Sequence, residues 1–118
     1  MQYIYSGKVI KGDAYGRKIG FPTINIDRKN FSRLEKKPAL GIYAGKALLN
    51  KKEYKAGIVI GPIDKKGLPK LEAHLVGYNG NAYGKVSVLE VNKFLRKFKK
   101  FKTEEELIAQ IKKDLQSL

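Results

Sequence analysis

The sequence contains no cysteine, a single histidine and few long apolar runs. Without cysteine, disulfide bonds and thiolate zinc sites are excluded, and a reducing compartment is permitted. Apolar runs such as "GIVIG" are far shorter than the roughly 20 residues that cross a bilayer. The first residues, "MQYIYSGK", also lack the apolar stretch of a signal peptide. We therefore expect a soluble, cytoplasmic protein.

Acidic side chains are also scarce. The chain has 11 Asp and Glu against 25 Lys and Arg, which gives a formal net charge of +14. A basic domain attracts polyanions, so nucleic acid, an anionic membrane and phosphorylated small molecules all remain open as partners. The basic residues are scattered, with no single long tract, which favours a solvated lysine-rich surface.

The chain of 118 residues fits one compact domain, residues 1–118. Short segments rich in β-branched and aromatic residues, bounded by Gly, Pro or Asn, dominate the first 95 positions and predict strands of an all-β barrel or sandwich. These segments are "YIYSGKVI", "GIYAGKALL", "EYKAGIVIG", "KLEAHLVG" and "KVSVLEV". A hairpin turn is expected near Asn50 to Lys52, and an Asn-Gly turn at Asn79 and Gly80.

The C-terminal segment changes to a helical period. Thr103 followed by Glu106 forms a capping box, in which the two side chains satisfy free backbone donors at a helix start. The sequence therefore predicts a helix of about 12 to 14 residues that packs against the barrel. Its apolar face comprises Leu107, Ile108, Ile111 and Leu115.

A glycine-containing loop near the N-terminus is a candidate anion site. No segment has the spacing of a phosphate-binding P-loop, because "GIYAGKA" and "GNAYGKV" are one residue short between their glycines and lack the Ser or Thr. In "KGDAYGRK", Gly12 and Gly16 would form a turn that lets backbone amides approach an anion, and Arg17 and Lys18 supply positive charge.

The segment "FPTIN" follows this loop. Pro22 fixes its own φ and keeps the preceding residue extended, so the chain continues in a β-like conformation. Thr23 and Asn25 then point to the same side. Their hydroxyl and amide oxygens are neutral ligands that suit a hard cation, although a surface turn with local capping is the alternative.

His74 and Glu72 lie two residues apart in "LEAHLVG". In a strand they share the face opposite Leu71, Ala73 and Leu75. A carboxylate there could act as a general base toward a hydroxyl group, and the alternative is a solvent-facing polar pair. One histidine without cysteine argues against a zinc site.

Taken in order, these motifs resemble the riboflavin kinase family over nearly the whole chain. The similar segments are "GKVIKGDAYGRKIGFPTIN", "GIYAG", "LEAHL", "AYGK" and "FLRKFKKFKTEEELIAQI". The resemblance implies a mainly β fold, a six-stranded Greek-key β-barrel with a C-terminal α-helix. It also implies phosphorylation of the riboflavin 5′-hydroxyl, with ATP as co-substrate, Mg²⁺ as metal and FMN as product.

The resemblance further implies roles for individual residues. Glu72 matches the family's catalytic glutamate, while His74 fits the pattern without an implied role. The implied nucleotide-binding residues are Gly12, Arg17, Thr23, Asn25 and Tyr83, of which Thr23 and Asn25 hold the metal. The implied flavin-binding residues are Arg96, Lys99 and Phe101.

Some features depart from the family pattern. Phe98 stands two positions after Arg96, where relatives usually carry an acidic residue, and "IGPIDKKG" differs from the common bacterial loop. Many bacterial relatives carry an N-terminal FMN adenylyltransferase, whose His-x-Gly-His is absent here, so we do not expect FAD synthesis on this polypeptide. We expect a monomer that binds riboflavin and ATP, with no membrane or nucleic-acid partner.

Two alternatives remain open at this point. A small basic β-barrel that binds RNA or single-stranded DNA would interleave aromatic and basic side chains on one face. A kinase-like barrel that binds flavin without turnover is the other, although the Thr23, Asn25 and Glu72 side chains argue against it.

Overall fold

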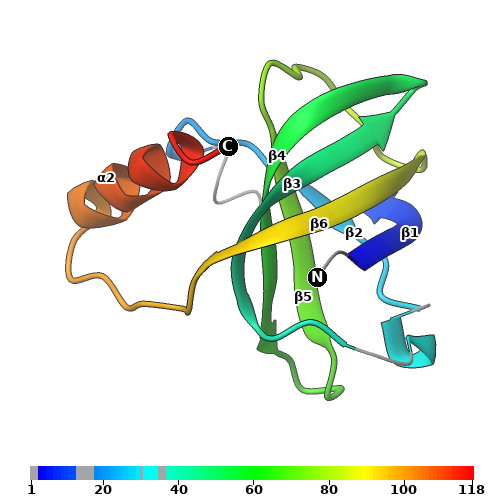
Figure 1. Ribbon diagram of the computed structural model, residues 1–118, viewed down its shortest axis with the longest axis horizontal. Helices are drawn as coiled ribbons and strands as arrows, with labels where there is room; N and C mark the ends of the chain where they lie inside the picture. Colours follow the sequence, from blue (N-terminus) through cyan, green and yellow to red (C-terminus); the bar gives the residue numbers. More distant parts are fainter. Residues whose placement is uncertain (1–2, 13–17, 30, 35–36) are drawn as a thin grey trace.

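The computed structural model describes residues 3–12, 18–29, 31–34 and 37–118. Within these residues the fold is a closed six-stranded antiparallel barrel with one C-terminal helix (Figure 1). The elements are β1 (Tyr3–Ile10), β2 (Ile24–Ile26), the 3-10 helix η1 (Phe31–Arg33), β3 (Gly41–Leu49), β4 (Lys52–Ile63), β5 (Pro69–Leu75), β6 (Val86–Arg96) and α2 (Glu104–Leu115).

The barrel has Greek-key topology. Its strand order is β1-β2-β5-β4-β3-β6, and β1 pairs with β6 to close it. The consecutive strands β3, β4 and β5 form a meander, and β6 returns to lie beside β3. A fourth strand that lies beside the first of three defines the Greek key. The predicted barrel is therefore confirmed, and the five predicted strand segments correspond to β1, β3, β4, β5 and β6.

Alternation along the strands separates the core from the outer face. In β2, Ile24 and Ile26 are buried, and in β5 Leu71, Ala73 and Leu75 are buried while the residues between them are partly exposed. This is the pattern of a strand with one face on a core. The side chains of the candidate site therefore lie outside the barrel lumen.

The β3–β4 hairpin turns where the sequence predicts it. Asn50 and Lys51 join the paired residues Leu49 and Lys52, and their φ angles are 53° and 63°. Positive φ at both central residues is the type I′ geometry, which matches the twist of antiparallel strands.

The turn predicted at Asn79 and Gly80 is displaced. The chain instead turns directly after β5, where the N–H of Tyr78 donates to the carbonyl of Leu75 at 3.3 Å. Gly77 has φ 83° and supplies the left-handed conformation inside that turn. Since β5 ends at Leu75, this turn precedes Asn79, and Gly80 is a bend in the loop that leads to β6.

Helix α2 begins as predicted and has 12 residues. Thr103 Oγ1 accepts a hydrogen bond from the N–H of Glu106 at 3.2 Å, and the Glu106 carboxylate accepts one from the N–H of Lys102 at 3.1 Å. The return bond thus reaches one residue before the cap instead of the cap itself. Over the described residues, no helix is long and apolar enough to cross a membrane.

The packing of α2 differs from the prediction. All of α2 is described, and none of its residues is fully buried. The helix stands beside the barrel at the end of the segment that leaves β6 (Figure 1). Leu107, Ile111 and Leu115 line a cavity between the helix and the barrel. The apolar face of α2 is therefore one wall of a cavity and does not sit flush on the sheet.

Candidate functional site

Two cavities meet at Thr23. The first, which we call the helix cavity, has a volume of about 340 Å³ and lies between α2 and the barrel. The second, the loop cavity, has a volume of about 390 Å³ and lies under the loop between β5 and β6. Residues that line the helix cavity include Thr23, Glu72, His74, Arg96, Phe98 and Phe101. Those of the loop cavity include Thr23, Tyr78, Asn79, Asn81 and Tyr83.

A third cavity, the hairpin cavity, adjoins the β4–β5 turn. Its volume is about 380 Å³, and it is lined by Gly12, Asn25, Arg28, Asp64 and Lys70, among others. Lys70 also lines the helix cavity. The predicted site residues that the structure describes are therefore distributed over three neighbouring cavities.

Thr23 and Asn25 flank the buried Ile24 at the start of β2. Since Ile24 and Ile26 point into the core, Thr23 and Asn25 lie on the opposite face, as the alternation predicts. They nevertheless line different cavities, because Thr23 borders the helix and loop cavities while Asn25 borders the hairpin cavity.

Gly12 lies directly against the Asn25 side chain. A Cβ added to Gly12 would be 2.1 Å from Asn25 Nδ2 and 2.6 Å from Oδ1. No side chain larger than hydrogen fits there without moving Asn25. Gly12 therefore allows the Asn25 side chain to pack directly against the backbone of residue 12. Arg17, the other basic candidate in this loop, lies outside the described residues.

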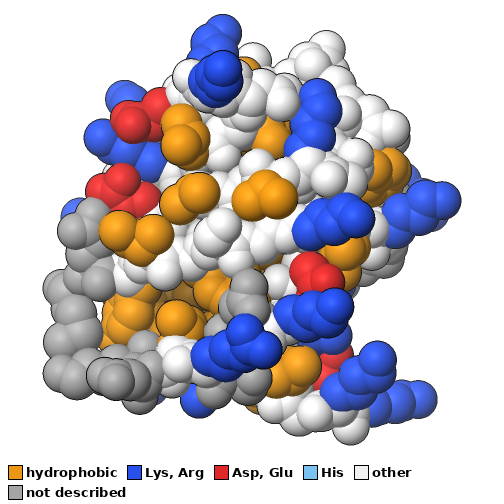
Figure 2. Space-filling view, turned by 90° about the vertical axis from the view of Figure 1, so that its right-hand side faces the viewer, with side chains coloured by type: hydrophobic (Ala, Val, Ile, Leu, Met, Phe, Trp, Pro, Cys, Tyr) orange, Lys and Arg blue, Asp and Glu red, His pale blue; other side chains and the backbone are white. Residues whose placement is uncertain are grey.

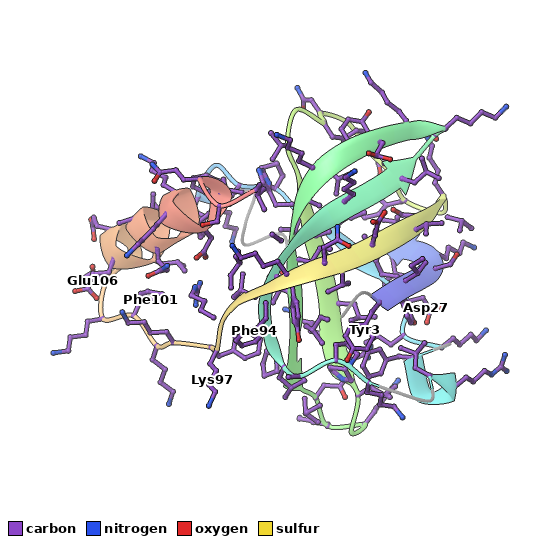
Figure 3. The ribbon with its side chains drawn as sticks, in the orientation of Figure 1. Tyr3, Asp27, Phe94, Lys97, Phe101 and Glu106 are labelled. Atoms are coloured by element: carbon purple, nitrogen blue, oxygen red, sulfur yellow. The ribbon has the colours of Figure 1, made fainter. Side chains whose placement is uncertain are left out.

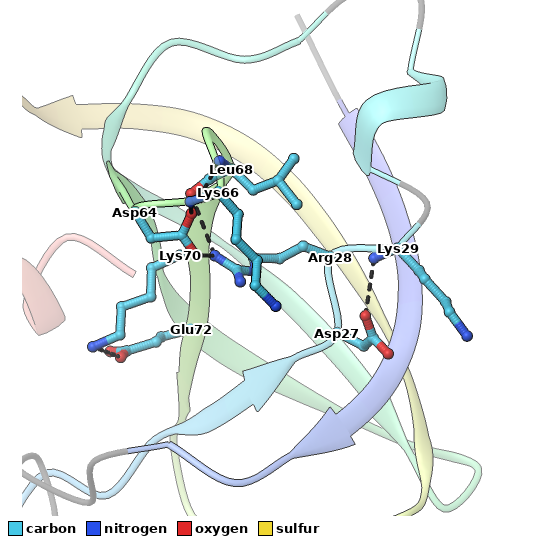
Figure 4. A network of polar contacts seen from close by, with 8 residues as sticks. All are labelled: Asp27, Arg28, Lys29, Asp64, Lys66, Leu68, Lys70 and Glu72. Atoms are coloured by element: carbon cyan, nitrogen blue, oxygen red, sulfur yellow. Dashed lines mark hydrogen bonds and ion pairs between the residues drawn. The ribbon is translucent and has the colours of Figure 1, made fainter.

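Glu72 lies on the outer face of β5, paired across the ladder with Asn25 of β2. Its side chain is 17% exposed, and its Oε1 lies 3.1 Å from Lys70 Nζ (Figure 4). Lys70 thus holds the carboxylate from the neighbouring position on the same strand face. The Glu72 side chain lines the helix cavity, as Thr23 does.

A salt bridge supports the wall of the hairpin cavity. Arg28 donates to the carboxylate of Asp64 and, at 3.3 Å, to the carbonyl of Leu68 (Figure 4). The Arg28 hydrogen bond holds the pKa of Asp64 below its ordinary value, and the N–H groups of Leu68 and Lys66 act in the same direction. The β4–β5 turn is thereby tied to the segment after β2.

Arg96, Lys99 and Phe101 come together in the wall of the helix cavity. Arg96 Cζ and Lys99 Nζ each lie 5.9 Å from the centre of the Phe101 ring. Figure 3 shows Phe101 on the segment between β6 and α2. Cations at this distance from an aromatic ring are attracted by its π face.

Asp114 of α2 belongs to the site, although no feature of the sequence was used to predict it. Its carboxylate accepts hydrogen bonds from Arg96 Nε at 3.0 Å and Arg96 Nη2 at 2.9 Å. The signal was present, because Asp114 is a charged residue between Ile111 and Leu115 on the apolar side of the helix. Phe98, at the position where an acidic residue was expected, instead approaches Gly61, with its Cε2 2.9 Å from a Cβ placed there.

We predict that Asp114→Ala loosens α2. Arg96 and Asp114 are 21% and 13% exposed, so the two-pronged pair is largely shielded from water. Its loss leaves Arg96 without its carboxylate, and we expect amide exchange in α2 to accelerate about 10-fold, equivalent to roughly 1.4 kcal/mol. Asp114→Asn, which keeps one acceptor oxygen, serves as control and should show a smaller increase. Unchanged exchange in Asp114→Ala would show that other contacts hold the helix.

Among the described residues, no group of three or more His, Cys, Asp and Glu side chains is arranged to hold a metal ion. Thr23 and Asn25, the metal ligands predicted from the sequence, offer neutral oxygens of the kind that a hard cation accepts, and they border different cavities.

Basic side chains do not gather into one band on the face of the molecule in Figure 2. Lys and Arg are spread over that face and are interrupted by hydrophobic and acidic side chains. A surface built for single-stranded nucleic acid would combine a basic groove with stacking aromatic rings. That face gives no support to the nucleic-acid alternative.

The family model and the curated relative agree on the family. The Flavokinase family model, described as riboflavin kinase, matches residues 1–118. The bifunctional riboflavin kinase/FMN adenylyltransferase of Bacillus subtilis (strain 168) is 37% identical over 119 residues, which cover 97% of this chain. This chain spans 37% of the length of that relative.

Two solved structures share the fold. A crystal structure from Streptococcus pneumoniae, described as a macrolide-efflux protein, has a TM-score of 0.82 at 27% identity, over 96% of this chain and 37% of that one. Riboflavin kinase from Trypanosoma brucei has a TM-score of 0.70 at 24% identity, over 98% of this chain and 76% of that one. The second likeness supports the fold alone.

Proposed function

The chain belongs to the riboflavin kinase family, and from this premise we propose that it transfers a phosphoryl group from ATP to the 5′-hydroxyl of riboflavin, giving FMN. The observation that carries the proposal is the junction of two cavities at Thr23, with the Glu72 carboxylate in the wall of one. Phosphoryl transfer requires that donor and acceptor meet at one point, beside a group that receives the acceptor's proton.

The helix cavity is the proposed riboflavin site. Its volume of about 340 Å³ is in the range of small-molecule sites. Phe21, Phe98 and Phe101 on its wall offer flat apolar surface to the isoalloxazine ring. We assign flavin contacts to Phe101 and to the cations Arg96 and Lys99 that flank its ring.

Glu72 is the proposed general base. In this role its carboxylate accepts the proton of the riboflavin 5′-hydroxyl as the oxygen forms a bond to the γ-phosphorus of ATP. The bond from that phosphorus to the β–γ bridging oxygen breaks, and ADP leaves. Lys70, 3.1 Å from the carboxylate, keeps Glu72 oriented on the outer face of β5.

We propose that the nucleotide binds in the loop cavity and in the part of the hairpin cavity that Gly12 lines. Tyr83 and Thr23 line the loop cavity, and Gly12 with Asn25 lines the hairpin cavity. Arg17 belongs to the same proposed group from its sequence position. We propose that the nucleotide extends along this side of β2, with its terminal phosphate at Thr23.

Mg²⁺ is the proposed metal, and Thr23 and Asn25 are the residues that would hold it. A bound magnesium ion neutralises charge on the phosphates during transfer. The Thr23 hydroxyl and Asn25 amide would orient the metal–nucleotide complex toward the acceptor, and Gly12 leaves the Asn25 amide its room. The described residues lack a cluster of carboxylates for the metal, consistent with an ion that arrives on the nucleotide.

The central test is to incubate the protein with riboflavin and Mg-ATP and to separate the flavins by chromatography. We expect FMN to form in a time- and enzyme-dependent manner, and to be absent without a nucleotide donor. Parallel reactions with other nucleoside triphosphates define the donor. If no FMN forms with any donor while riboflavin still binds, the chain is a flavin-binding barrel without turnover. Absence of FMN with every donor overturns the proposed function, whether or not riboflavin binds.

We further propose that residues 1–118 act as a single kinase domain and as a monomer. The strand pairing that closes the barrel runs from β1 near the N-terminus to β6, and α2 contributes a wall of the same cavity. Sedimentation of the purified chain tests the monomer.

A further inference from the structure

We propose that His74 is a positioning residue, whose imidazole holds the Pro22 carbonyl and thereby fixes Thr23 at the junction of the two cavities. This inference rests on the proposed function, because the position of the transferred phosphate at Thr23 is part of that proposal. His74 is the single histidine of the chain.

The hydrogen bond stands where the β2–β5 ladder ends. The last backbone pair is Ile24 with Ala73, and His74 follows on β5. There His74 Nδ1 lies 2.7 Å from the carbonyl oxygen of Pro22. Because Pro22 has no N–H, it cannot donate to the ladder, and the side chain of His74 links the two segments instead.

This contact determines which tautomer the neutral imidazole adopts. A carbonyl oxygen only accepts, so Nδ1 must carry the hydrogen and donate it. In the neutral ring Nε2 is then the unprotonated nitrogen. The tautomer is therefore a direct readout of the contact in the folded protein.

The ring is also held from its side. The Phe21 and His74 ring centres are 5.9 Å apart with an interplanar angle of 72°, an edge-to-face arrangement. Both side chains line the helix cavity. A histidine held by the hydrogen bond and the ring contact has little freedom to rotate away from Pro22.

Thr23 is thus restrained on both sides. Ile24, which follows it, is 8% exposed and packs in the core, and Pro22, which precedes it, is bound by His74. Misplacement of a reacting or orienting group by about 1 Å can cost about 10²-fold in rate. Loss of the hydrogen bond to the Pro22 carbonyl should therefore lower kcat/KM for Mg-ATP while the melting temperature stays unchanged.

Two variants separate the hydrogen bond from the ring. In His74→Asn, the amide nitrogen is as many bonds from Cα as Nδ1 and retains the donor, whereas His74→Phe retains a ring against Phe21 and removes the donor. We expect His74→Phe to lower kcat/KM for Mg-ATP about 10- to 100-fold, and His74→Asn to stay within about 3-fold of the original protein. Because His74 also lines the helix cavity, the riboflavin dissociation constant is measured for both variants, and the loss in kcat/KM for Mg-ATP is compared at saturating riboflavin.

The proposal fails if His74→Phe, with an unchanged melting temperature, keeps its kcat/KM for Mg-ATP. It also fails if kcat/KM falls as far in His74→Asn as in His74→Phe.

Nitrogen-15 NMR of the unsubstituted protein adds a test that needs neither variant. One histidine gives one imidazole signal set, which must show Nδ1–H; an Nε2–H tautomer overturns the contact. Absence of FMN formation by the original protein would defeat the proposed function but leave the tautomer result standing.

Discussion

Glu72→Gln is expected to slow FMN formation by about 10² to 10⁴-fold, the usual contribution of a general base. The amide keeps the size of the side chain and one acceptor oxygen, but it cannot take the proton of the riboflavin hydroxyl. Single-turnover mixing of enzyme-bound riboflavin with Mg-ATP measures this step without interference from product release. Riboflavin affinity should stay near that of the unsubstituted protein, because the wall of the helix cavity keeps its shape.

The fold should tolerate this substitution. Glu72 lies on the outer face of β5, and its exchange removes one ion pair with Lys70, whose own side chain is 42% exposed. Such a change typically costs under about 1 kcal/mol. The melting temperature should therefore change little while the rate collapses.

The chain offers a matched control. Glu53 of β4 pairs with Lys46 of β3 at 3.2 Å, and the two side chains are 60% and 48% exposed. Glu53→Gln removes a carboxylate and a lysine pair in the same way, at a position that is not proposed to contact substrate. We expect its rate to be unchanged. A near-normal rate in Glu72→Gln would remove Glu72 from the mechanism.

The strands and the faces of their side chains could be predicted because the information is local. A period of two along β5 is enough to assign Glu72 and His74 to the outer face, and Thr103 with Glu106 is enough to start α2. The structure confirms these assignments. The resemblance to a family then supplied the barrel topology, which local patterns alone left open between barrel and sandwich.

What could not be predicted depends on contacts distant in sequence. Pro22 and His74 are 52 residues apart, and Arg96 and Asp114 are 18 apart. Such pairs meet only after the barrel has closed and α2 has been positioned, so no spacing rule reveals them. The position of α2 could not be predicted for the same reason. Its apolar face predicts contact with the barrel, but the sequence does not show that a cavity separates that face from the barrel wall.

Thr23→Val is expected to lower kcat/KM for Mg-ATP by about 10²-fold or more, on the scale by which a displaced or lost orienting group reduces rate. Valine keeps the branched shape that suits the extended chain before Ile24 and removes the hydroxyl oxygen. Thr23→Ser is the control, since serine keeps that oxygen and loses a methyl group. We expect serine to stay within about 10-fold of the unsubstituted protein.

The metal dependence separates a ligand from a packing residue. If the Thr23 hydroxyl holds the metal that arrives with ATP, excess free magnesium cannot replace it, because the missing oxygen belongs to the protein. The deficit of Thr23→Val should therefore persist as magnesium is raised. Calorimetric titration should show weaker binding of Mg-ATP and little change for ATP with the metal chelated. Equal losses for both nucleotide forms would assign Thr23 to phosphate contact, and normal kinetics in Thr23→Val would exclude the Thr23 hydroxyl from both metal and phosphate binding.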